Sequence, residues 1–176
     1  MLKPTPPIHV LDTERLRLRT LAEDDAPFIL ELINEPSWLR FIGDRGVRSV
    51  EQARDYLVKG PIAMHARHGF SLYLIELKDG GVPIGLCGLI KRDSLPDVDL
   101  GYALLPRFWG RGYAREAAAA ALAHGVGVLG LQRIVAITSP DNDRSMLLLE
   151  QIGFGRERRV ALSEGEAEVE LFGYSA

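Results

Sequence analysis

Cysteine is nearly absent from this chain, because Cys87 is the only one among 176 residues. A disulfide framework and a cysteine-rich zinc site both need several cysteines, so the composition excludes both. The shortage also fits a reducing compartment, and we expect a cytoplasmic protein. Cys87 lies in the apolar run IGLCGL, residues 84–89, which predicts a buried strand in which it is a small core residue rather than a nucleophile.

Long hydrophobic runs and an excess of positive charge are also missing. No apolar stretch approaches the roughly 20 residues that span a membrane, and residues 1–10 hold three prolines without the apolar core of a secretion signal. The net charge of -3 and the isoelectric point near 5.8 argue against general nucleic-acid binding. A metal site at His65 and His68 would need further ligands close in space, so we interpret these histidines as a solvated pair.

The composition that remains, 47% hydrophobic and 26% charged, predicts one globular domain over residues 1–176. Strict alternation at residues 15–20 predicts a first strand with its leucines inward and its arginines on a solvated face. The same reasoning gives six further strands, at residues 71–77, 83–90, 97–105, 132–138, 155–161 and 167–174. Helical spacing predicts helices at residues 24–34, 50–67, 114–129 and 141–152. This order predicts a mixed α/β fold, a single sheet layer with helices on both faces.

Pro61 lies inside the second of these helices and should kink or split it. Ser49 has the position of its N-cap, with Gln52 at capping-box spacing. We therefore expect residues 36–66 to form irregular helix, a flexible wall over a substrate pocket.

The stretch LGYALLPRFWGRGYARE, residues 100–116, predicts an anion site. Its strand ends at Pro106, which has no N–H to donate, and Gly110 and Gly112 then precede a run of strong helix formers. Glycines at this junction leave backbone N–H groups exposed at the positive end of a helix. No acid occurs between Asp99 and Glu116, whereas three arginines do, at positions 107, 111 and 115. The pattern indicates a diphosphate-binding turn.

Two better-known phosphate motifs do not fit this turn. No Gly-Lys-Ser/Thr follows it, so a Walker loop is excluded. A dinucleotide fingerprint would need a third glycine where Arg115 stands, and an acid after the next strand, where Ser139-Pro140 stands.

The sequence resembles the GNAT superfamily of acyl-CoA N-acyltransferases, in the branch typified by the ribosomal-protein N-terminal acetyltransferases of the RimJ/RimL type. The motifs together are specific, and they span nearly the whole chain. They are TERLRLR (13–19), IGLCG (84–88), WGRGYA (109–114) after Pro106, LQRI (131–134), Asn142 with Ser145, and Gly153-Phe154.

The resemblance implies the GNAT fold, a mixed and mostly antiparallel sheet of six to seven strands splayed at the cofactor cleft. It also implies an acetyl-CoA-dependent N-acetyltransferase, in which a primary amine attacks acetyl-CoA directly in a ternary complex. The amine can be a protein N-terminus or a small molecule, and the sequence does not decide between them. Acetyl-CoA is the co-substrate, and no metal, nucleic acid or membrane is implied. Dimers occur in the family, but no residue here decides the oligomeric state.

The family's Gln/Arg-x-x-Gly-x-Gly/Ala pattern falls on Trp109, Gly112 and Ala114 when it is placed three residues past the proline. Arg107, Gly110 and Gly112 also satisfy the pattern, but they lie too close to Pro106. The resemblance implies that amides from Gly110 to Arg115 hold the pyrophosphate and that the strand edge before Pro106 pairs with pantetheine. The expected cofactor residues are Tyr102, Ala103, Leu104, Trp109, Gly110, Arg111, Gly112, Tyr113, Ala114, Arg115 and Asn142. Asn142 is equally suited to cap the helix that begins there.

The chemistry needs a polarised carbonyl, a neutral amine and a proton for the departing thiolate. The amide of Leu104 or Leu105 can polarise the carbonyl. For the base, Asp99 stands where relatives often carry a strand glutamate. With an unperturbed pKa of about 3.9, it needs burial or an intervening water. Glu164 and Glu166 in the last hairpin are the alternative, because the ribosomal branch also has a carboxylate in that region.

Many relatives place the proton-donating tyrosine seven residues after the motif asparagine, where this chain has Leu149. The tyrosine mechanism is therefore not carried over. Ser145 matches the serine proposed as the acid in the ribosomal branch. Ser145 could equally have a structural role in the first turn of the helix, and water could replace it as the proton donor. Leu149 and the open choice of base leave a second hypothesis, a CoA-binding sensor or interaction module without turnover. A nucleotide-binding α/β domain is a third.

Overall fold

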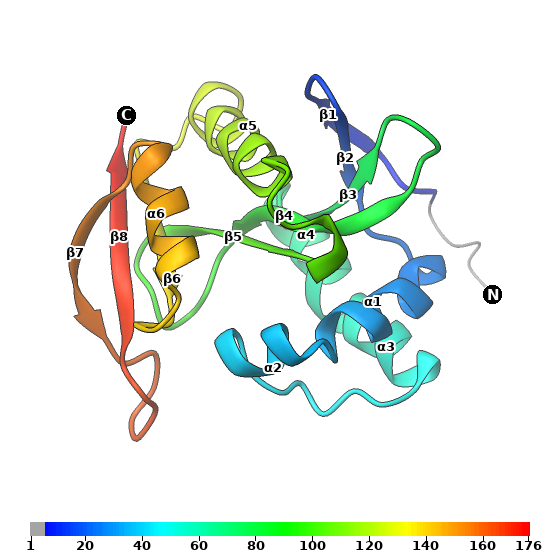
Figure 1. Ribbon diagram of the computed structural model, residues 1–176, viewed down its shortest axis with the longest axis horizontal. Helices are drawn as coiled ribbons and strands as arrows, with labels where there is room; N and C mark the ends of the chain where they lie inside the picture. The colour runs from blue at the N-terminus through cyan, green and yellow to red at the C-terminus, as the bar shows by residue number, and fades with distance from the viewer. Residues whose placement is uncertain (1–5) are drawn as a thin grey trace.

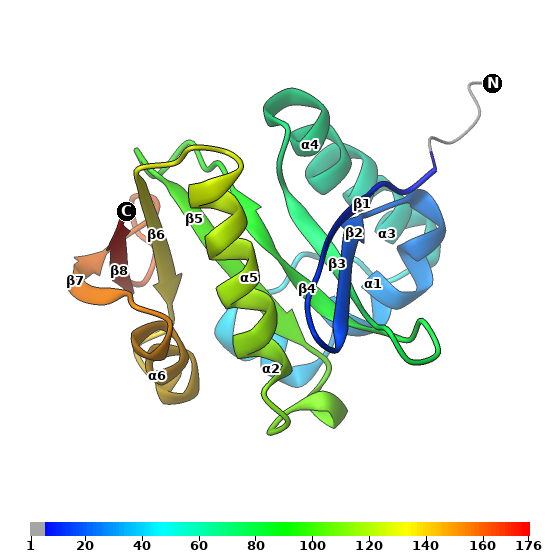
Figure 2. The same cartoon turned by 90° about the horizontal axis from the view of Figure 1, so that it is seen from above.

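One sheet of eight strands organises the fold, in the order β1-β2-β3-β4-β5-β6-β8-β7 (Figures 1 and 2). The strands are β1 (His9–Asp12), β2 (Leu16–Thr20), β3 (Leu72–Leu77), β4 (Pro83–Ile90), β5 (Val98–Leu104), β6 (Arg133–Thr138), β7 (Gly155–Val160) and β8 (Val169–Ser175). Every neighbouring pair is antiparallel except β5 and β6, which are parallel. The computed structural model describes residues 6–176. The expected absence of a secretion signal rests partly on residues 1–5, which lie outside this range.

Helices cover both faces of the sheet (Figures 1 and 2). One face carries α1 (Ala26–Ile33), α2 (Pro36–Phe41), α3 (Val50–Leu57) and α4 (Ala63–His68), and the other carries α5 (Tyr113–Gly127) and α6 (Asp143–Gln151). On the first face, α1 and α3 bury their apolar sides against Leu74 and Leu86. On the second, the alanines of α5 pack on Leu16, Leu18 and Ile75. Adjacent residues Leu74 and Ile75 thus serve opposite cores, as the alternation of a strand requires. None of the helices described is long and apolar enough to cross a membrane.

The sheet opens between β5 and β6. These strands pair only at Val98 with Ile134 and at Asp99 with Val135, although both continue for several more residues. On its other side β5 stays paired with β4 as far as Leu104. The splayed sheet predicted from the family resemblance is therefore confirmed, and the opening lies beside the N-terminus of α5.

Two details differ from the expectations. The sheet has eight strands rather than six or seven, because the short edge strand β1 pairs with β2. The arginines of β2 are not all solvated. The Arg19 side chain is 18% exposed and lies 2.8 Å from both Asp25 and Glu76, so it is a partly buried ion-pair centre. Pro61 splits the predicted helix as expected, because a π-helical turn, Val58–Ile62, separates α3 from α4.

Candidate functional site

The loop from β5 to α5 is built on two glycines in the left-handed region. Gly110 has φ +74° and Gly112 has φ +81°, a conformation that side-chain-bearing residues adopt only with strain. The first helical bond of α5 runs from the N–H of Glu116 to the carbonyl of Gly112, at 3.0 Å. The amides of residues 113–115 therefore precede any intrahelical acceptor and are free to bind an anion.

A cavity of about 590 Å³ lies beside this loop, in the opening between β5 and β6. Ten of the eleven expected cofactor residues line it, Arg111 being the exception. They are Tyr102, Ala103, Leu104, Trp109, Gly110, Gly112, Tyr113, Ala114, Arg115 and Asn142. Other parts of its lining come from α2 and from the first turns of α6, where no cofactor residue was expected.

The edge of β5 that faces the cavity carries backbone groups that do not pair with β4. The N–H of Leu105 bonds to the carbonyl of Ile84 at 2.9 Å, so Leu105 cannot polarise a carbonyl, and that alternative was wrong. By the alternation of an antiparallel ladder, Ala103 also points its backbone groups at β4, whereas Tyr102 and Leu104 point theirs at the opening. The amide of Leu104 remains the candidate donor.

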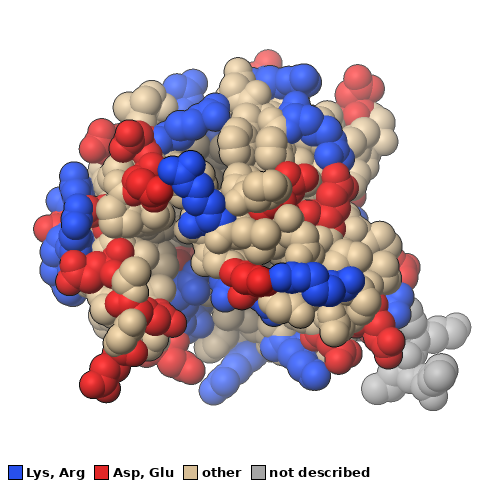
Figure 3. Space-filling view, turned by 60° about the horizontal axis from the view of Figure 1, so that its bottom comes forward, with Lys and Arg blue, Asp and Glu red and all other residues tan. Residues whose placement is uncertain are grey.

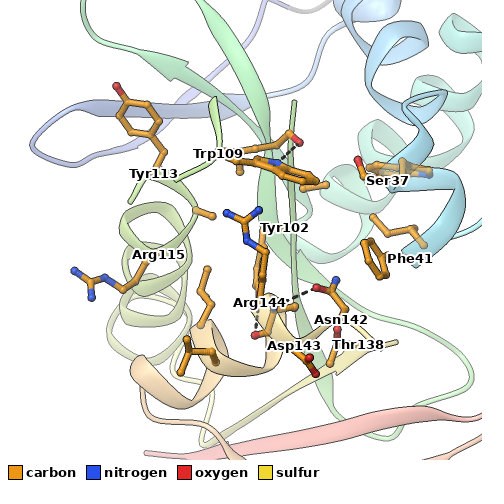
Figure 4. A pocket seen from close by; sticks show the side chains of 18 of the residues that line it. Ser37, Phe41, Tyr102, Trp109, Tyr113, Arg115, Thr138, Asn142, Asp143 and Arg144 are labelled. Atoms are coloured by element: carbon orange, nitrogen blue, oxygen red, sulfur yellow. Dashed lines mark hydrogen bonds between the residues drawn. The ribbon is translucent and has the colours of Figure 1, made fainter. Parts of the chain in front are cut away.

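Trp109 and Arg144 meet at the mouth of the cavity (Figure 4). The indole Nε1 of Trp109 donates to the carbonyl of Leu104 at 2.9 Å, which fastens the loop to the end of β5. The guanidinium carbon of Arg144, on α6, lies 5.0 Å from the centroid of the Trp109 ring. This cation–π contact joins the two sides of the opening. Sequence reasoning missed Arg144, which is separated from Trp109 by a whole helix and strand.

The three arginines around the loop have different surroundings. Arg107 pairs with Glu31 at 2.6 Å, so its charge is already partnered. The exposed Arg111 does not line the cavity, and its carbonyl accepts from Arg15. Arg115 does line it. Of the three, only Arg115 borders the cavity, and Figure 4 shows its side chain directed away from Tyr102 and Trp109.

A network under α5 holds the loop in place. Arg15 pairs with Glu116 at 2.7 Å, and its guanidinium carbon lies 4.4 Å from the centroid of the Tyr113 ring. Burial raises the pKa of Glu116, but hydrogen bonds from Thr13 and Arg15 outweigh it, so the pKa is lowered overall. The carboxylate thus stays charged and anchors the first turn of the helix.

Asn142 caps α6, because its Oδ1 accepts from the N–H of Ser145 at 3.2 Å. Asn142 also lines the cavity, so its two predicted roles remain compatible. The hydroxyl of Ser145 lies 2.8 Å from the phenol oxygen of Tyr102. Leu149 is only 1% exposed.

A second cavity, of about 650 Å³, lies toward α2, α3 and the β7–β8 hairpin. Asp99, Arg92 and Glu166 are among the residues that line it. Eight residues line both cavities, so the two cavities meet there. These residues are Trp38, Phe41, Ile42, Tyr102, Ala103, Ile137, Thr138 and Ser145.

The candidate bases differ in their surroundings. Asp99 is 1% exposed and both its carboxylate oxygens lie near the Nε of Arg92, at 3.1 and 3.2 Å. Burial raises the pKa of Asp99 and outweighs Arg92, which lowers it. Glu164 is exposed and lines neither cavity, whereas its neighbour Glu166 borders the second one. Of the candidate bases named from the sequence, Asp99 and Glu166 are therefore the two that line the second cavity, which Asp93 also lines.

An ion pair links α2 to the turn on the opposite side of the opening between β5 and β6. Arg40, on α2, lies 3.0 Å from Asp141, in the turn before α6, and both are exposed. Trp38, also on α2, has the one buried side-chain N–H without a hydrogen-bond partner among the residues that the structure describes.

Residues 6–176 contain no group of three or more His, Cys, Asp or Glu residues placed to hold a metal ion. On the face drawn in Figure 3, acidic and basic side chains are interspersed rather than gathered into one basic patch.

Comparison with known proteins gives a consistent result. Residues 15–155 match the model of the acetyltransferase (GNAT) domain. The N-acetyltransferase YoaA of Bacillus subtilis (strain 168), itself uncharacterized, is 30% identical over 149 residues, 84% of each chain. An acetyltransferase structure from Agrobacterium tumefaciens str. C58 is 27% identical, with a TM-score of 0.79 over 100% of this chain and 98% of that one. RimL, a ribosomal L7/L12 alpha-N-protein acetyltransferase solved with coenzyme A, shares the fold at 21% identity, with a TM-score of 0.80 over 95% of this chain and 97% of that one.

Proposed function

The chain belongs to the GNAT acetyltransferase family, whose members use acetyl-CoA, and we propose that it transfers the acetyl group to a primary amine in a ternary complex. We propose further that residues 1–176 form one such domain and that it is of the RimJ/RimL type. The acceptor would be a protein N-terminus or a small-molecule amine. The observation that carries the proposal is the meeting of two cavities where β5 and β6 separate, next to the free amides of α5.

The first cavity suits the donor. A diphosphate at the N-terminus of α5 would meet the amides of residues 110–115, the positive end of the helix and Arg115. The pantetheine arm would then follow the edge of β5 at Tyr102 and Leu104, and its amides would pair with the backbone as an added strand does. This direction leads the thioester toward the residues shared by the two cavities.

The second cavity suits the acceptor. An amine entering there would approach the thioester carbonyl, and the amide of Leu104 would stabilise the negative charge that develops on the carbonyl oxygen. Attack forms the C–N bond and breaks the C–S bond. The surplus proton of the amine would pass to Asp99, directly or through a water molecule. The raised pKa of Asp99 brings this carboxyl closer to the range in which a general base is effective.

The test has a binding step and a turnover step. Isothermal titration should detect acetyl-CoA, and a panel of N-terminal peptides, polyamines, aminoglycosides and amino-acid-like amines should identify acceptors by thiol release. With an accepted amine, Asp99→Asn should lower kcat about 10²-fold or more. The matched control is Asp79→Asn, an exposed acid in the β3–β4 turn. Binding without thiol release across the panel would favour a non-catalytic CoA-binding module. No binding of acetyl-CoA would contradict the proposal altogether.

A further inference from the structure

Three hydroxyl groups line both cavities, those of Tyr102, Thr138 and Ser145. The acetyl group must leave its thiol within this shared space if it is to reach an amine in the second cavity. The departing thiolate needs a proton or a hydrogen-bond donor there. The source of that donor is therefore to be sought among these three side chains before water is invoked.

The chemistry of the hydroxyls separates them. A phenol has an unperturbed pKa of about 10, whereas the hydroxyls of serine and threonine are far weaker acids. Tyr102 is therefore the strongest proton donor of the three. Many relatives carry a tyrosine at the position of Leu149. In this chain a buried apolar side chain occupies that position, so it supplies no second phenol.

The Tyr102 phenol is held by the first turn of α6. Its hydroxyl donates to the Ser145 carbonyl at 3.2 Å and lies 2.8 Å from the Ser145 hydroxyl, where either oxygen can be the donor. Ser145 is itself fixed by the bond from its N–H to Asn142. Figure 4 shows the Tyr102 ring standing in the cavity, between Trp109 with Arg144 on one side and Asn142 on the other. The ring thus reaches from β5 across the opening in which pantetheine would lie.

We propose that Tyr102 donates its phenolic proton to the sulfur of the departing CoA and that Ser145 positions the phenol. This inference rests on the proposed function. The amine nitrogen bonds to the acetyl carbon, the C–S bond breaks, and its electron pair goes to sulfur. The phenolic proton passes to that sulfur. The surplus proton of the amine leaves to Asp99 or to water, and Tyr102 regains a proton from solvent through the Ser145 hydroxyl.

Burial keeps the donor protonated under the conditions that test it. Burial raises the pKa of Tyr102, against a smaller lowering by the hydrogen bond to Ser145. Cys87 lies opposite Tyr102 on the neighbouring strand β4. Burial raises the pKa of the Cys87 thiol as well. At pH 9.5 the thiol of bound CoA can ionise while Tyr102 still carries its proton.

The experiment needs no acceptor, because it compares CoA with desulfo-CoA, which lacks the thiol. Dissociation constants are measured by isothermal titration at pH 6.5 and pH 9.5. In the unaltered protein, the preference for CoA over desulfo-CoA should rise about ten- to hundredfold between the two pH values, because a hydrogen bond to a charged group is stronger than one to a neutral group. Tyr102→Phe should abolish most of this rise in the preference for CoA over desulfo-CoA.

Matched variants separate Tyr102 from its neighbours. Tyr174→Phe, on β8, should keep the full rise. Ser145→Ala should reduce the rise only in part, because the donor remains. Introducing 3-fluorotyrosine at position 102 makes the phenol more acidic without removing it and should increase the preference. This substitution also serves if Tyr102→Phe folds poorly.

The contrary outcomes are distinct from one another. An equal rise in Tyr102→Phe and in the unaltered protein would overturn the role of Tyr102 while leaving the cofactor site intact. Loss of the rise in Ser145→Ala alone would make Ser145 the donor and would also overturn it. Failure of the unaltered protein to bind either ligand would overturn the proposed function, and the role of Tyr102 with it.

Discussion

Replacing Arg92 with glutamine tests whether Asp99 is a buried carboxylate that depends on one cation. Asp99 is 1% exposed and Arg92 is 29% exposed, so the change leaves a nearly buried charge without its partner. Removing one member of a buried ion pair costs about 3–5 kcal/mol, and the partial exposure of Arg92 brings the expected loss to about 2–3 kcal/mol. For a chain of this length that corresponds to a decrease in Tm of roughly 4–12 °C near neutral pH.

The loss should depend on pH. Burial raises the pKa of Asp99, and Arg92 is the main group that lowers it, so the pKa rises further in Arg92→Gln. A carboxyl whose pKa is higher in the folded state than in the unfolded state favours folding while it is protonated. Its contribution to stability is fully present below its unfolded-state pKa and is lost as the pH rises through its folded-state pKa. The variant should therefore approach the unaltered protein as the pH falls toward about 4 and lose stability relative to it as the pH rises. If Asp99 is the base, the acid limb of the activity profile should also move to higher pH.

Differential scanning calorimetry between pH 4 and 8 measures this difference. The control is the double variant Asp99→Asn with Arg92→Gln, in which no unpaired charge remains and most of the stability should return. A loss of the same size at every pH, or one that the double variant retains in full, would refute the reasoning.

Three further predictions concern the parts of the site and its support. Gly112→Ala forces a side chain into φ +81° and should cost about 1–2 kcal/mol of unfolding free energy, measured by thermal melts; Gly127→Ala, at ordinary φ in open space, should be neutral or stabilising. Arg144→Ala removes the contact with Trp109 and should weaken acetyl-CoA binding about two- to fivefold by titration calorimetry, while Arg158→Ala on β7 leaves it unchanged. Arg19→Met leaves Asp25 and Glu76 unpaired and should destabilise the fold by about 2–3 kcal/mol in urea unfolding, compared with less than about 1 kcal/mol for the exposed Arg17→Met.

The elements with strong local signals could be predicted from the sequence. The alternation of β2, the turn between β3 and β4, and the proline and glycines between β5 and α5 all depend on neighbouring residues. The edge strand β1 escaped prediction because it has only four residues, none of them buried. The splay between β5 and β6 followed only from the family resemblance, because no local pattern shows where two parallel strands stop pairing.

The functional pairs were harder to predict because they join distant segments. Arg107 belongs to the predicted basic cluster, but its partner, Glu31, lies 76 positions away and removes it from the anion site. Tyr102 and Ser145 were each singled out, yet their contact spans 43 positions and brings a phenol to the first turn of α6. Which acid borders the second cavity, Glu164 or Glu166, depends on how the hairpin folds back, and neighbouring residues do not determine that.

Backbone amide NMR during a titration with acetyl-CoA tests whether the turn before α5 binds the diphosphate and whether the edge of β5 binds the pantetheine arm. The largest shifts should fall on the amides of residues 110–115, followed by those of Tyr102 and Leu104 on the open edge of β5. Leu105, whose amide is bonded to Ile84, should shift much less. Saturable binding that leaves residues 110–115 unperturbed would contradict the account.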